Sequence, residues 1–186
     1  YDALQGTVKG EDQWNFERFI CAHIIMLGIE GVPAFYVHSL LATGNDYQRM
    51  ENAGHNRAIN RHQWDYPELE KELLDVGSRH ARVFGELKRL LAIRARQKAF
   101  HPNATQFTLH LGEQVFAFWR QSMDRRQSIF CISNISDEEQ KILLSRVNLI
   151  NTEDWFDLID SQMVDLNAEY LTLKPYQSVW ISNYNK

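Results

Sequence analysis

The sequence predicts a mixed α/β segment over residues 1–101 and an all-β domain over residues 102–186. Two observations carry this division. In the first segment, an apolar face with helical spacing is followed by a short apolar run, which is typical of a β/α unit. After about residue 102 the pattern changes to short, β-rich runs separated by turn residues. With 44% hydrophobic and 24% charged residues, the 186-residue chain has the composition of an ordinary globular protein.

The first helix is predicted from Glu11 to about residue 27. Its apolar side chains recur at the i, i+3, i+4 spacing and are Phe16, Phe19, Ile20, Ile24 and Leu27. Gly28 and Gly31 are expected to end it. Residues 32–37 then form an apolar run without alternation, which predicts a strand covered on both faces. Since one strand cannot make a sheet, this segment needs partner strands that the chain does not contain.

Two further helices are predicted after residue 64. Asp65 and Glu68 stand at the spacing of a capping box, with a proline in the first turn, and predict a helix over residues 68–75. Ser78 is the expected N-cap of the next helix, which runs to about residue 98. The side chains on the buried face of that helix would be Val83, Leu87, Leu90 and Leu91.

The second segment is predicted to be an antiparallel β domain. Residues 105–111 and 115–121 flank Gly112 and indicate a hairpin. Further strands are predicted over residues 128–132, 155–159 and 178–182. Trp119, Trp155 and Trp180 lie on these strands and could stack against sugars, but filling the core is the more frequent role of a strand tryptophan.

Charge and cysteine usage limit the partners and the compartment. The net charge of −4 gives no overall basic field for nucleic acid or for an anionic membrane. The longest apolar stretch, residues 19–37, is interrupted by a histidine, a glutamate and a proline, and indicates buried core and not a membrane span. Cys21 and Cys131 lie in apolar runs, which favours free buried thiols and a reducing, cytoplasmic compartment. Because the sequence begins at Tyr1, we expect it to be a piece of a longer protein.

The candidate site lies in the long polar loop of residues 38–64. In α/β barrels the active site is built from loops that follow the carboxyl ends of the strands. Arg57 and Arg61 lie four residues apart, with Asn56 and Asn60 beside them. A guanidinium group presents a rigid fork of donors that suits a carboxylate or paired sugar hydroxyls. The alternative is a structural arginine–carboxylate pair that closes the loop.

No cofactor or metal is expected. The seven histidines are scattered without the spacing of metal ligands. The motifs of P-loop proteins, serine hydrolases, zinc proteases and thioredoxin-like redox sites are absent. Basic residues make the helix over residues 79–98 positive, and we interpret this as a solvated face because the rest of the chain is acidic.

Several segments share a pattern with one known family. They are residues 31–37, Leu40-Leu41-Ala42 with Asn45-Asp46, Asn56-Arg57-Ala58-Ile59-Asn60-Arg61-His62, Arg94-Ala95-Arg96 and residues 171–180. In these segments the sequence resembles the sucrose phosphorylase branch of the α-amylase superfamily, glycoside hydrolase family 13. The segment from Arg57 to His62 is the most specific of them.

The resemblance implies a fold. Residues 1–101 would be the closing part of a (β/α)8 TIM barrel, followed over residues 102–186 by an antiparallel, β-sandwich-like C-terminal domain. Within the barrel, residues 11–27 match helix 7, residues 32–37 match strand 8 and residues 65–98 match the eighth helical layer. The remainder of the barrel is expected upstream.

The resemblance also implies a reaction. The family's phosphorylases are retaining glycosyltransferases of carbohydrate metabolism that move glucose between a small glucoside and inorganic phosphate, giving glucose 1-phosphate. The glucoside would be sucrose, sucrose phosphate or glucosylglycerate. The catalytic aspartates and glutamate of the family precede barrel helix 7, so no catalytic residue is expected in this chain, which alone should be inactive.

The substrate-binding residues implied by the resemblance are Arg57, Asn60 and Arg61. Arg57 matches an arginine that helps to hold the glucosyl ring, and the other two match adjacent positions that support the loop. Sucrose phosphorylases tend to have glycine where this chain has Asn56, which leaves the acceptor open. The alternatives are a hydrolase or transglucosylase of the same superfamily, or a non-catalytic carbohydrate-binding module built on the β domain.

Overall fold

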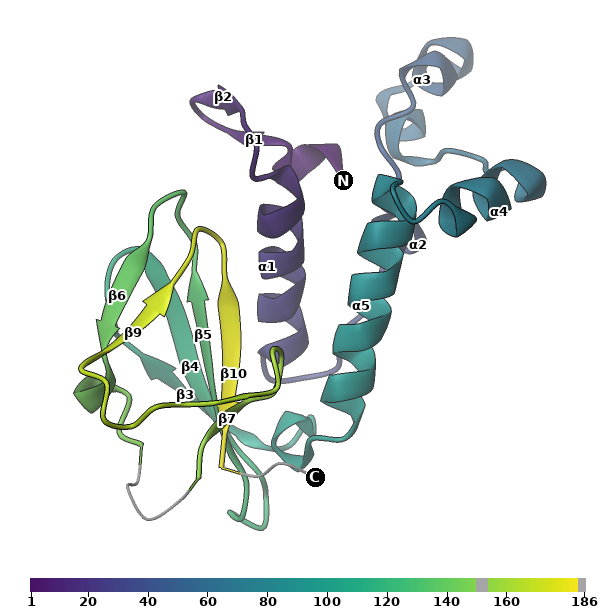
Figure 1. Cartoon of the computed structure of the whole chain (residues 1–186). Helices are drawn as coiled ribbons and strands as arrows, with labels where there is room; N and C mark the ends of the chain where they lie inside the picture. Colours follow the sequence, from purple (N-terminus) through teal and green to yellow (C-terminus); the bar gives the residue numbers. More distant parts are fainter. Residues whose placement is uncertain (150–153, 184–186) are drawn as a thin grey trace. The chain divides into compact units, whose positions relative to one another are not determined.

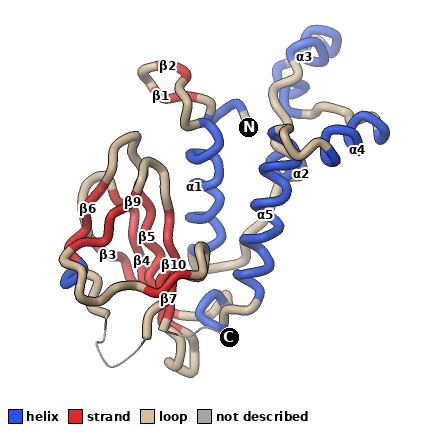
Figure 2. Tube along the Cα trace, in the orientation of Figure 1, coloured by secondary structure: helices blue, strands red, loops and turns tan. Residues whose placement is uncertain are grey.

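A computed structural model describes residues 1–149 and 154–183 of the chain. The chain divides into two compact units, the first comprising Tyr1–Ile20 and Ala34–Arg89, the second Cys21–Pro33 and Leu90–Lys186. Apart from one short hairpin near the N-terminus, the strands belong to the second unit (Figure 2). The helices α1 (Asn15–Gly28) and α5 (Arg79–Ala95) each contribute residues to both units.

The first unit is helical apart from the hairpin of β1 (Gly6–Thr7) and β2 (Gly10–Glu11). Besides its shares of α1 and α5, its helical elements are η1 (Asp2–Leu4), α2 (Val37–Leu40), α3 (Tyr47–Ala53), the 3-10 turn η2 (Asn56–Asn60) and α4 (Tyr66–Leu74). The polar segment that was predicted to be a loop therefore contains α3 and η2, which give it defined local structure.

The strand predicted over residues 32–37 is wrong. Residues 32–36 pair with no strand, and Val37 begins α2. Three apolar side chains of this run are at least half exposed, namely Val32 (79%), Tyr36 (50%) and Val37 (53%). A strand exists only where a neighbour satisfies its backbone N–H and C=O groups, and the described part of the chain places no strand beside this run.

The helix start predicted at Ser78 is confirmed, but the start predicted at Glu11 is wrong, because Glu11 belongs to β2 and α1 begins at Asn15. The Ser78 hydroxyl accepts a hydrogen bond from the backbone N–H of Ala81 at 3.0 Å and so caps α5 as expected. Helix α4 begins at Tyr66 with a proline in its first turn, but the side chain of Asp65 makes no capping hydrogen bond. The side chains of Val83, Leu87 and Leu90 on α5 are fully buried.

The second unit is built on two antiparallel sheets (Figure 1). The larger has the order β3-β4-β5-β10-β7-β8 and consists of β3 (Thr105–Leu109), β4 (Val115–Gln121), β5 (Ser128–Asn134), β7 (Phe156–Asp157), β8 (Gln162–Met163) and β10 (Ser178–Ser182). The smaller pairs β6 (Gln140–Leu143) with β9 (Tyr170–Leu173). Two 3-10 turns, η3 (Lys98–Phe100) and η4 (Leu144–Arg146), complete the unit. The predicted hairpin is confirmed by the pairing of Thr105 with Gln121.

The core of the second unit contains side chains from both sheets. It comprises Leu111, Val115, Ala117, Phe130, Ile132, Ile142, Val147, Trp155, Leu173, Val179 and Ile181. Helix α1 lies against the larger sheet through its C-terminal part, where a Cβ at Gly28 would come within 2.9 Å of the Phe118 ring. The ring centroids of Phe100 and Trp180 lie 4.8 Å apart, so η3 also packs against the larger sheet. The chain is therefore a mixture of helices and antiparallel sheet, as predicted.

A buried arginine joins three backbone segments of the second unit. Arg120 on β4 is fully buried, and its guanidinium group donates to the carbonyl oxygens of Gly28 at 2.7 Å, His101 at 2.9 Å and Ala104 at 3.3 Å. These bonds attach the end of α1 and the start of the β domain to the sheet. Burial lowers the pKa of Arg120 below its usual value, because it removes water from the charged form.

None of the helices formed by residues 1–149 and 154–183 has both the length and the apolar character needed to cross a lipid bilayer.

Candidate substrate-binding site

The predicted site residues lie together on and beside one 3-10 turn. Arg57 and Asn60 belong to η2, and Arg61 follows it directly. The turn is held by its buried residue Ala58, while the side chains of Arg57, Asn60 and Arg61 are exposed. Within the described part of the chain, neither guanidinium group makes a hydrogen bond or ion pair. The structural arginine–carboxylate pair considered as an alternative is therefore not formed there.

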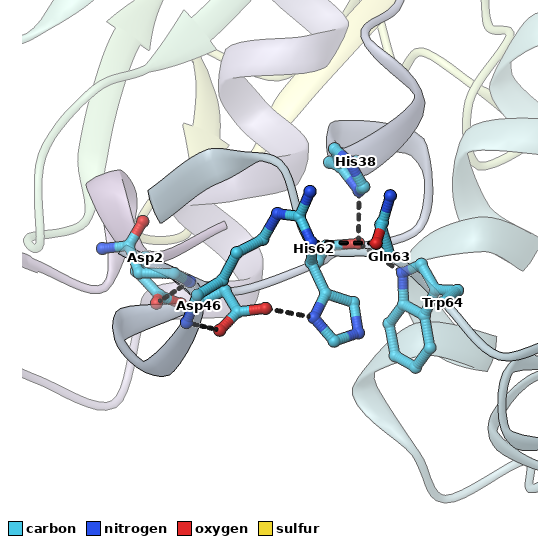
Figure 3. A network of polar contacts seen from close by, with 9 residues as sticks. Asp2, His38, Asp46, His62, Gln63 and Trp64 are labelled. Atoms are coloured by element: carbon cyan, nitrogen blue, oxygen red, sulfur yellow. Dashed lines mark hydrogen bonds and ion pairs between the residues drawn. The ribbon is translucent and has the colours of Figure 1, made fainter. Parts of the chain in front are cut away.

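Asp46 connects this turn to helix α3. Its carboxylate caps α3 by accepting the backbone N–H of Arg49 at 2.8 Å, and its second oxygen lies 2.7 Å from Nδ1 of His62 (Figure 3). Its own backbone N–H donates to the carbonyl oxygen of Ile59 at 2.7 Å. The hydrogen bond to His62, followed by that from Arg49, holds the pKa of Asp46 below its usual value, so the carboxylate is ionised at neutral pH.

Thr43 is the centre of a second group of contacts beside the first. Its hydroxyl accepts from Nε1 of Trp64 at 3.0 Å and lies 3.2 Å from Nδ1 of His38. The Thr43 hydroxyl still has a hydrogen and a second lone pair, so it can donate to or accept from Nδ1 of His38. Burial lowers the pKa of this histidine.

His80 is fixed by the same loop. Its Nδ1 lies 2.6 Å from the carbonyl oxygen of Leu41, and the Trp64 ring stands edge-on to it at 5.0 Å. Because a carbonyl oxygen only accepts, Nδ1 of His80 carries the proton. His38, His62 and His80 are thus each held by a hydrogen-bonding partner in this loop.

A pocket of about 350 Å³ lies against these contacts. Its lining is formed by Thr43, Gly44, Asn45, Asp46, Tyr47, Gln48, His62, Trp64, Glu68, Arg79 and His80. Aromatic rings, amides, carboxylates and a guanidinium group together suit a ligand rich in hydroxyls. Arg57, Asn60 and Arg61 do not line this pocket, although they follow Asp46 on the same loop.

Sequence reasoning located the arginines but missed the contacts that hold them. Asp46 and His62 are 16 residues apart, and neither periodicity nor a motif marks them as a pair. The one available signal was the richness of the loop in hydrogen-bonding side chains. Among residues 1–149 and 154–183, no three or more His, Cys, Asp or Glu side chains gather in a way that could hold a metal ion.

The tryptophans of the β domain serve mainly as core. Trp155 and Trp180 are 2% and 0% exposed, which confirms the prediction that they fill the interior. Trp119 is partly buried and stacks between Phe107 at 4.8 Å and Phe130 at 5.8 Å. The faces of Trp155 and Trp180 are therefore not open to a sugar, which weakens the alternative of a carbohydrate-binding module.

Comparison with known proteins identifies the relatives of the chain. It is 35% identical over 182 residues to the glucosylglycerate phosphorylase of Allomeiothermus silvanus. The aligned region covers 97% of this chain and 30% of that protein. The chain is related to the glucosyl phosphorylases. The glucosylglycerate phosphorylase of Escherichia coli is 35% identical over 181 residues, with the same two coverages, 97% and 30%. The resemblance inferred from the sequence is thus confirmed. The chain spans about 30% of the length of these curated relatives.

A shorter match agrees with this relationship. The glucosylglycerol phosphorylase of Marinobacter adhaerens is 36% identical over 73 residues, which is 39% of the chain and 14% of that protein. No model of a known protein family matches the chain.

The fold is shared with enzymes of the α-amylase type. An α-amylase from Anoxybacillus superposes with a TM-score of 0.68 at 13% identity, over 90% of this chain and 32% of that one. The trehalose-6-phosphate hydrolase of Bacillus licheniformis gives a TM-score of 0.66 at 17% identity, over 91% and 39% of the two chains. At these identities the likeness establishes the fold alone.

Proposed function

We propose that the chain is the C-terminal part of a retaining glucosyl phosphorylase. Residues 1–101 would complete a (β/α)8 barrel, and residues 102–186 would form the β domain that follows it. A barrel of this kind takes about 250 residues, more than this chain can supply. The exposure of Val32, Tyr36 and Val37, which are half exposed or more, supports the proposal, because a larger protein would cover such apolar side chains.

The proposed reaction moves glucose between a small glucoside and inorganic phosphate and yields glucose 1-phosphate. Glycerate is the favoured acceptor, because the relatives that match 97% of the chain are named glucosylglycerate phosphorylases. Retaining chemistry requires two carboxyl groups about 5–5.5 Å apart across the sugar, and we place them in the upstream part of the barrel. Buried, unpaired Cys21 and Cys131 support a reducing, cytoplasmic compartment.

Arg57 is the residue of this chain that we assign to substrate. The observation that carries the assignment is its free guanidinium group on a turn whose backbone is held by Asp46 and Ala58. Because the backbone is fixed and the guanidinium N–H groups have no other partner in the described part of the chain, the side chain suits bidentate hydrogen bonding to two hydroxyls of the glucosyl ring. Such contacts orient the ring and add binding energy. Asn60 and Arg61, on the same turn, would support this contact.

The assignment predicts a large kinetic effect of Arg57→Ala in the complete enzyme. Two charge-assisted hydrogen bonds of about 1.5 kcal/mol each correspond to a loss of roughly 100-fold in kcat/KM. Phosphorolysis of glucosylglycerate, followed as glucose 1-phosphate formed, measures it. Arg126→Ala is the matched control, because Arg126 is also exposed but lies in the second unit. Kinetics of Arg57→Ala equal to those of the control would refute the assignment.

The same assay separates phosphorolysis from hydrolysis. Glucose 1-phosphate should form from glucosylglycerate only when phosphate is present, and more slowly from sucrose. Release of free glucose at an equal rate without phosphate would instead indicate a hydrolase of the same superfamily. The 186-residue chain alone should produce no glucose 1-phosphate, because its catalytic carboxylates are expected upstream.

A further inference from the structure

We propose that Asp46 and His62 are positioning residues that hold the Arg57 turn in its binding geometry. The proposal rests on the function proposed above, because it concerns how that site is kept in place. Both side chains line the pocket of about 350 Å³, but the role proposed for them requires no contact with the substrate. Their effect on the reaction would pass entirely through the position of Arg57.

The Arg57 turn lies between two stretches of the loop whose side chains are hydrogen-bonded to each other. We call residues 43–49 and residues 62–64 the loop base. The contacts across it are His62 Nδ1 to Asp46 Oδ2 at 2.7 Å, Arg49 Nη1 to Gln63 Oε1 at 2.9 Å and Trp64 Nε1 to Thr43 Oγ1 at 3.0 Å. Figure 3 shows that these contacts follow one another along the loop base. Arg57 lies in the segment that the loop base closes.

Asp46 differs from the other members of the loop base because it also reaches the turn itself. Its backbone N–H binds the carbonyl oxygen of Ile59 inside η2, and one carboxylate oxygen caps α3 at Arg49. The remaining oxygen binds His62, the residue that follows Arg61. Asp46 therefore holds the turn at two places, at Ile59 within η2 and at His62 beyond its C-terminal end.

The pair of Asp46 and His62 is shielded enough to act as a rigid link. The two side chains are 19% and 29% exposed, respectively, and the Trp64 ring stands edge-on to the His62 ring at 4.8 Å. A charged acceptor with limited access to water forms a stronger hydrogen bond than a surface pair. Rotation of the His62 ring would break that bond and the ring contact together.

The arginine has no other means of orientation within the described part of the chain. Its side chain is exposed and binds no neighbour there, so its direction depends on the backbone of η2. A displacement of about 1 Å at a positioning group can cost on the order of 100-fold in rate. Loosening the loop base should therefore reduce catalysis even though the arginine is still present.

The test uses His62 variants of the complete enzyme. His62→Ala removes the donor to Asp46 and should lower kcat/KM for glucosylglycerate phosphorolysis by about 10-fold or more. His62→Asn should restore most of it, to within about 3-fold of wild type, because the asparagine amide nitrogen takes nearly the place of Nδ1 and donates to the same carboxylate. Equal losses in the two variants would overturn the proposal.

A double-mutant cycle separates positioning from general structure. In an Arg57→Ala background, adding His62→Ala should cause no further loss in kcat/KM, since its effect passes through the missing arginine. An additive loss would show that His62 acts elsewhere and would refute the proposal. Asp46→Ala should behave like His62→Ala in the same cycle, and the His62 pair decides the outcome if Asp46→Ala does not fold.

Asp124→Ala is the matched control. Asp124 also accepts side-chain and backbone hydrogen bonds, from Ser122, Lys98 and the backbone N–H of Arg126, but it belongs to the second unit. Its kcat/KM should equal that of wild type. The two proposals fail in different ways: an unaffected Arg57→Ala removes the assignment of Arg57, whereas an impaired Arg57→Ala with an unaffected His62→Ala removes only the role of the loop base.

Discussion

The second unit encloses a continuous cluster of apolar side chains contributed by two sheets, whereas the first unit holds its long loop through hydrogen bonds among polar side chains. Apolar burial contributes about 1.5–3 kcal/mol for each large side chain. A typical hydrogen bond contributes about 0.5–1.5 kcal/mol net, but it fixes direction and distance. The difference indicates that the second unit is built for stability and that the loop of the first is built to place side chains.

Large apolar side chains stay exposed in both units. In the first unit, Tyr36, Val37, Tyr66 and Leu74 are half exposed or more, and helix α4 has no buried residue. In the second unit, Val32, Met123 and Met163 are more than half exposed, although strands β5 and β10 are buried along almost their whole length. Both units therefore have apolar surface left to cover, as the proposal of a longer enzyme would require.

The largest predicted effect on stability is at Arg120, where the second unit depends on a polar group inside its core. Arg120→Met keeps much of the side-chain volume but leaves the carbonyl oxygens of Gly28, His101 and Ala104 without their donors. We expect a loss of about 2–4 kcal/mol in the free energy of unfolding of the 186-residue chain, measured by urea denaturation. Arg120→Lys should recover little, because one ammonium group lacks the fork that reaches three acceptors.

A stability of Arg120→Met equal to that of wild type would contradict this view. It would mean that apolar packing alone holds α1 and the start of the β domain to the sheet. Arg126→Met is the control, since Arg126 lies on the same unit but is exposed, and it should change stability by less than about 0.5 kcal/mol.

A smaller effect is predicted at Thr43, in the loop of the first unit. Thr43→Val keeps the shape of the side chain but leaves Nε1 of Trp64 without its acceptor. The cost should be about 1 kcal/mol, and it should stay local. Hydrogen exchange should quicken in residues 41–64 and remain unchanged in β4, β5 and β10.

Thr43→Ser provides the matched control for this local effect. Serine restores the hydroxyl, so the exchange rates of the loop should return close to those of wild type. Faster exchange throughout both units in Thr43→Val would instead mean that the loop and the β domain unfold as one, and the contrast between the two units would fail.

The features that could be predicted from the sequence are those that depend on residues near one another in the chain. The hairpin of β3 and β4, strand β10 and the cap at Ser78 were predicted because each depends on side chains close together in the chain. The arginine turn was located through its resemblance to a family. These are elements whose determinants are local or shared with relatives.

The remaining features depend on partners that local sequence does not specify. The apolar run at residues 32–37 has the composition of a strand, but a strand requires hydrogen-bonded neighbours, and residues 1–149 and 154–183 form none beside it. The pairing of Asp46 with His62 joins residues from two stretches of a polar loop, where no periodicity marks a common face. The three acceptors of Arg120 likewise come from distant segments, so its burial could not be inferred from its strand alone.

The two units should also differ in the pH at which acid first weakens them. In the first unit, burial lowers the pKa of His38 below its usual value of 6.5. The unfolded chain then binds more protons than the folded one, so this contribution to stability falls as the pH drops below about 6.5. His38→Asn removes the titrating group but keeps a side chain that can hydrogen-bond with the Thr43 hydroxyl, and it should make the loop less sensitive to pH between 7 and 5.

In the second unit, stability should begin to fall only at a lower pH. The Ser122 hydroxyl, followed by the N–H of Arg126, lowers the pKa of Asp124 from 3.8 to about 2. A carboxyl group with a lowered pKa stabilises the fold above its unfolded value, and this contribution is lost as the pH falls through the folded value. Hydrogen exchange between pH 7 and 2 should therefore quicken first in residues 38–64 and only below about pH 3.8 in residues 122–127. The reverse order would show that the polar loop resists acid better than the β domain, and the division of roles between the two units would have to be abandoned.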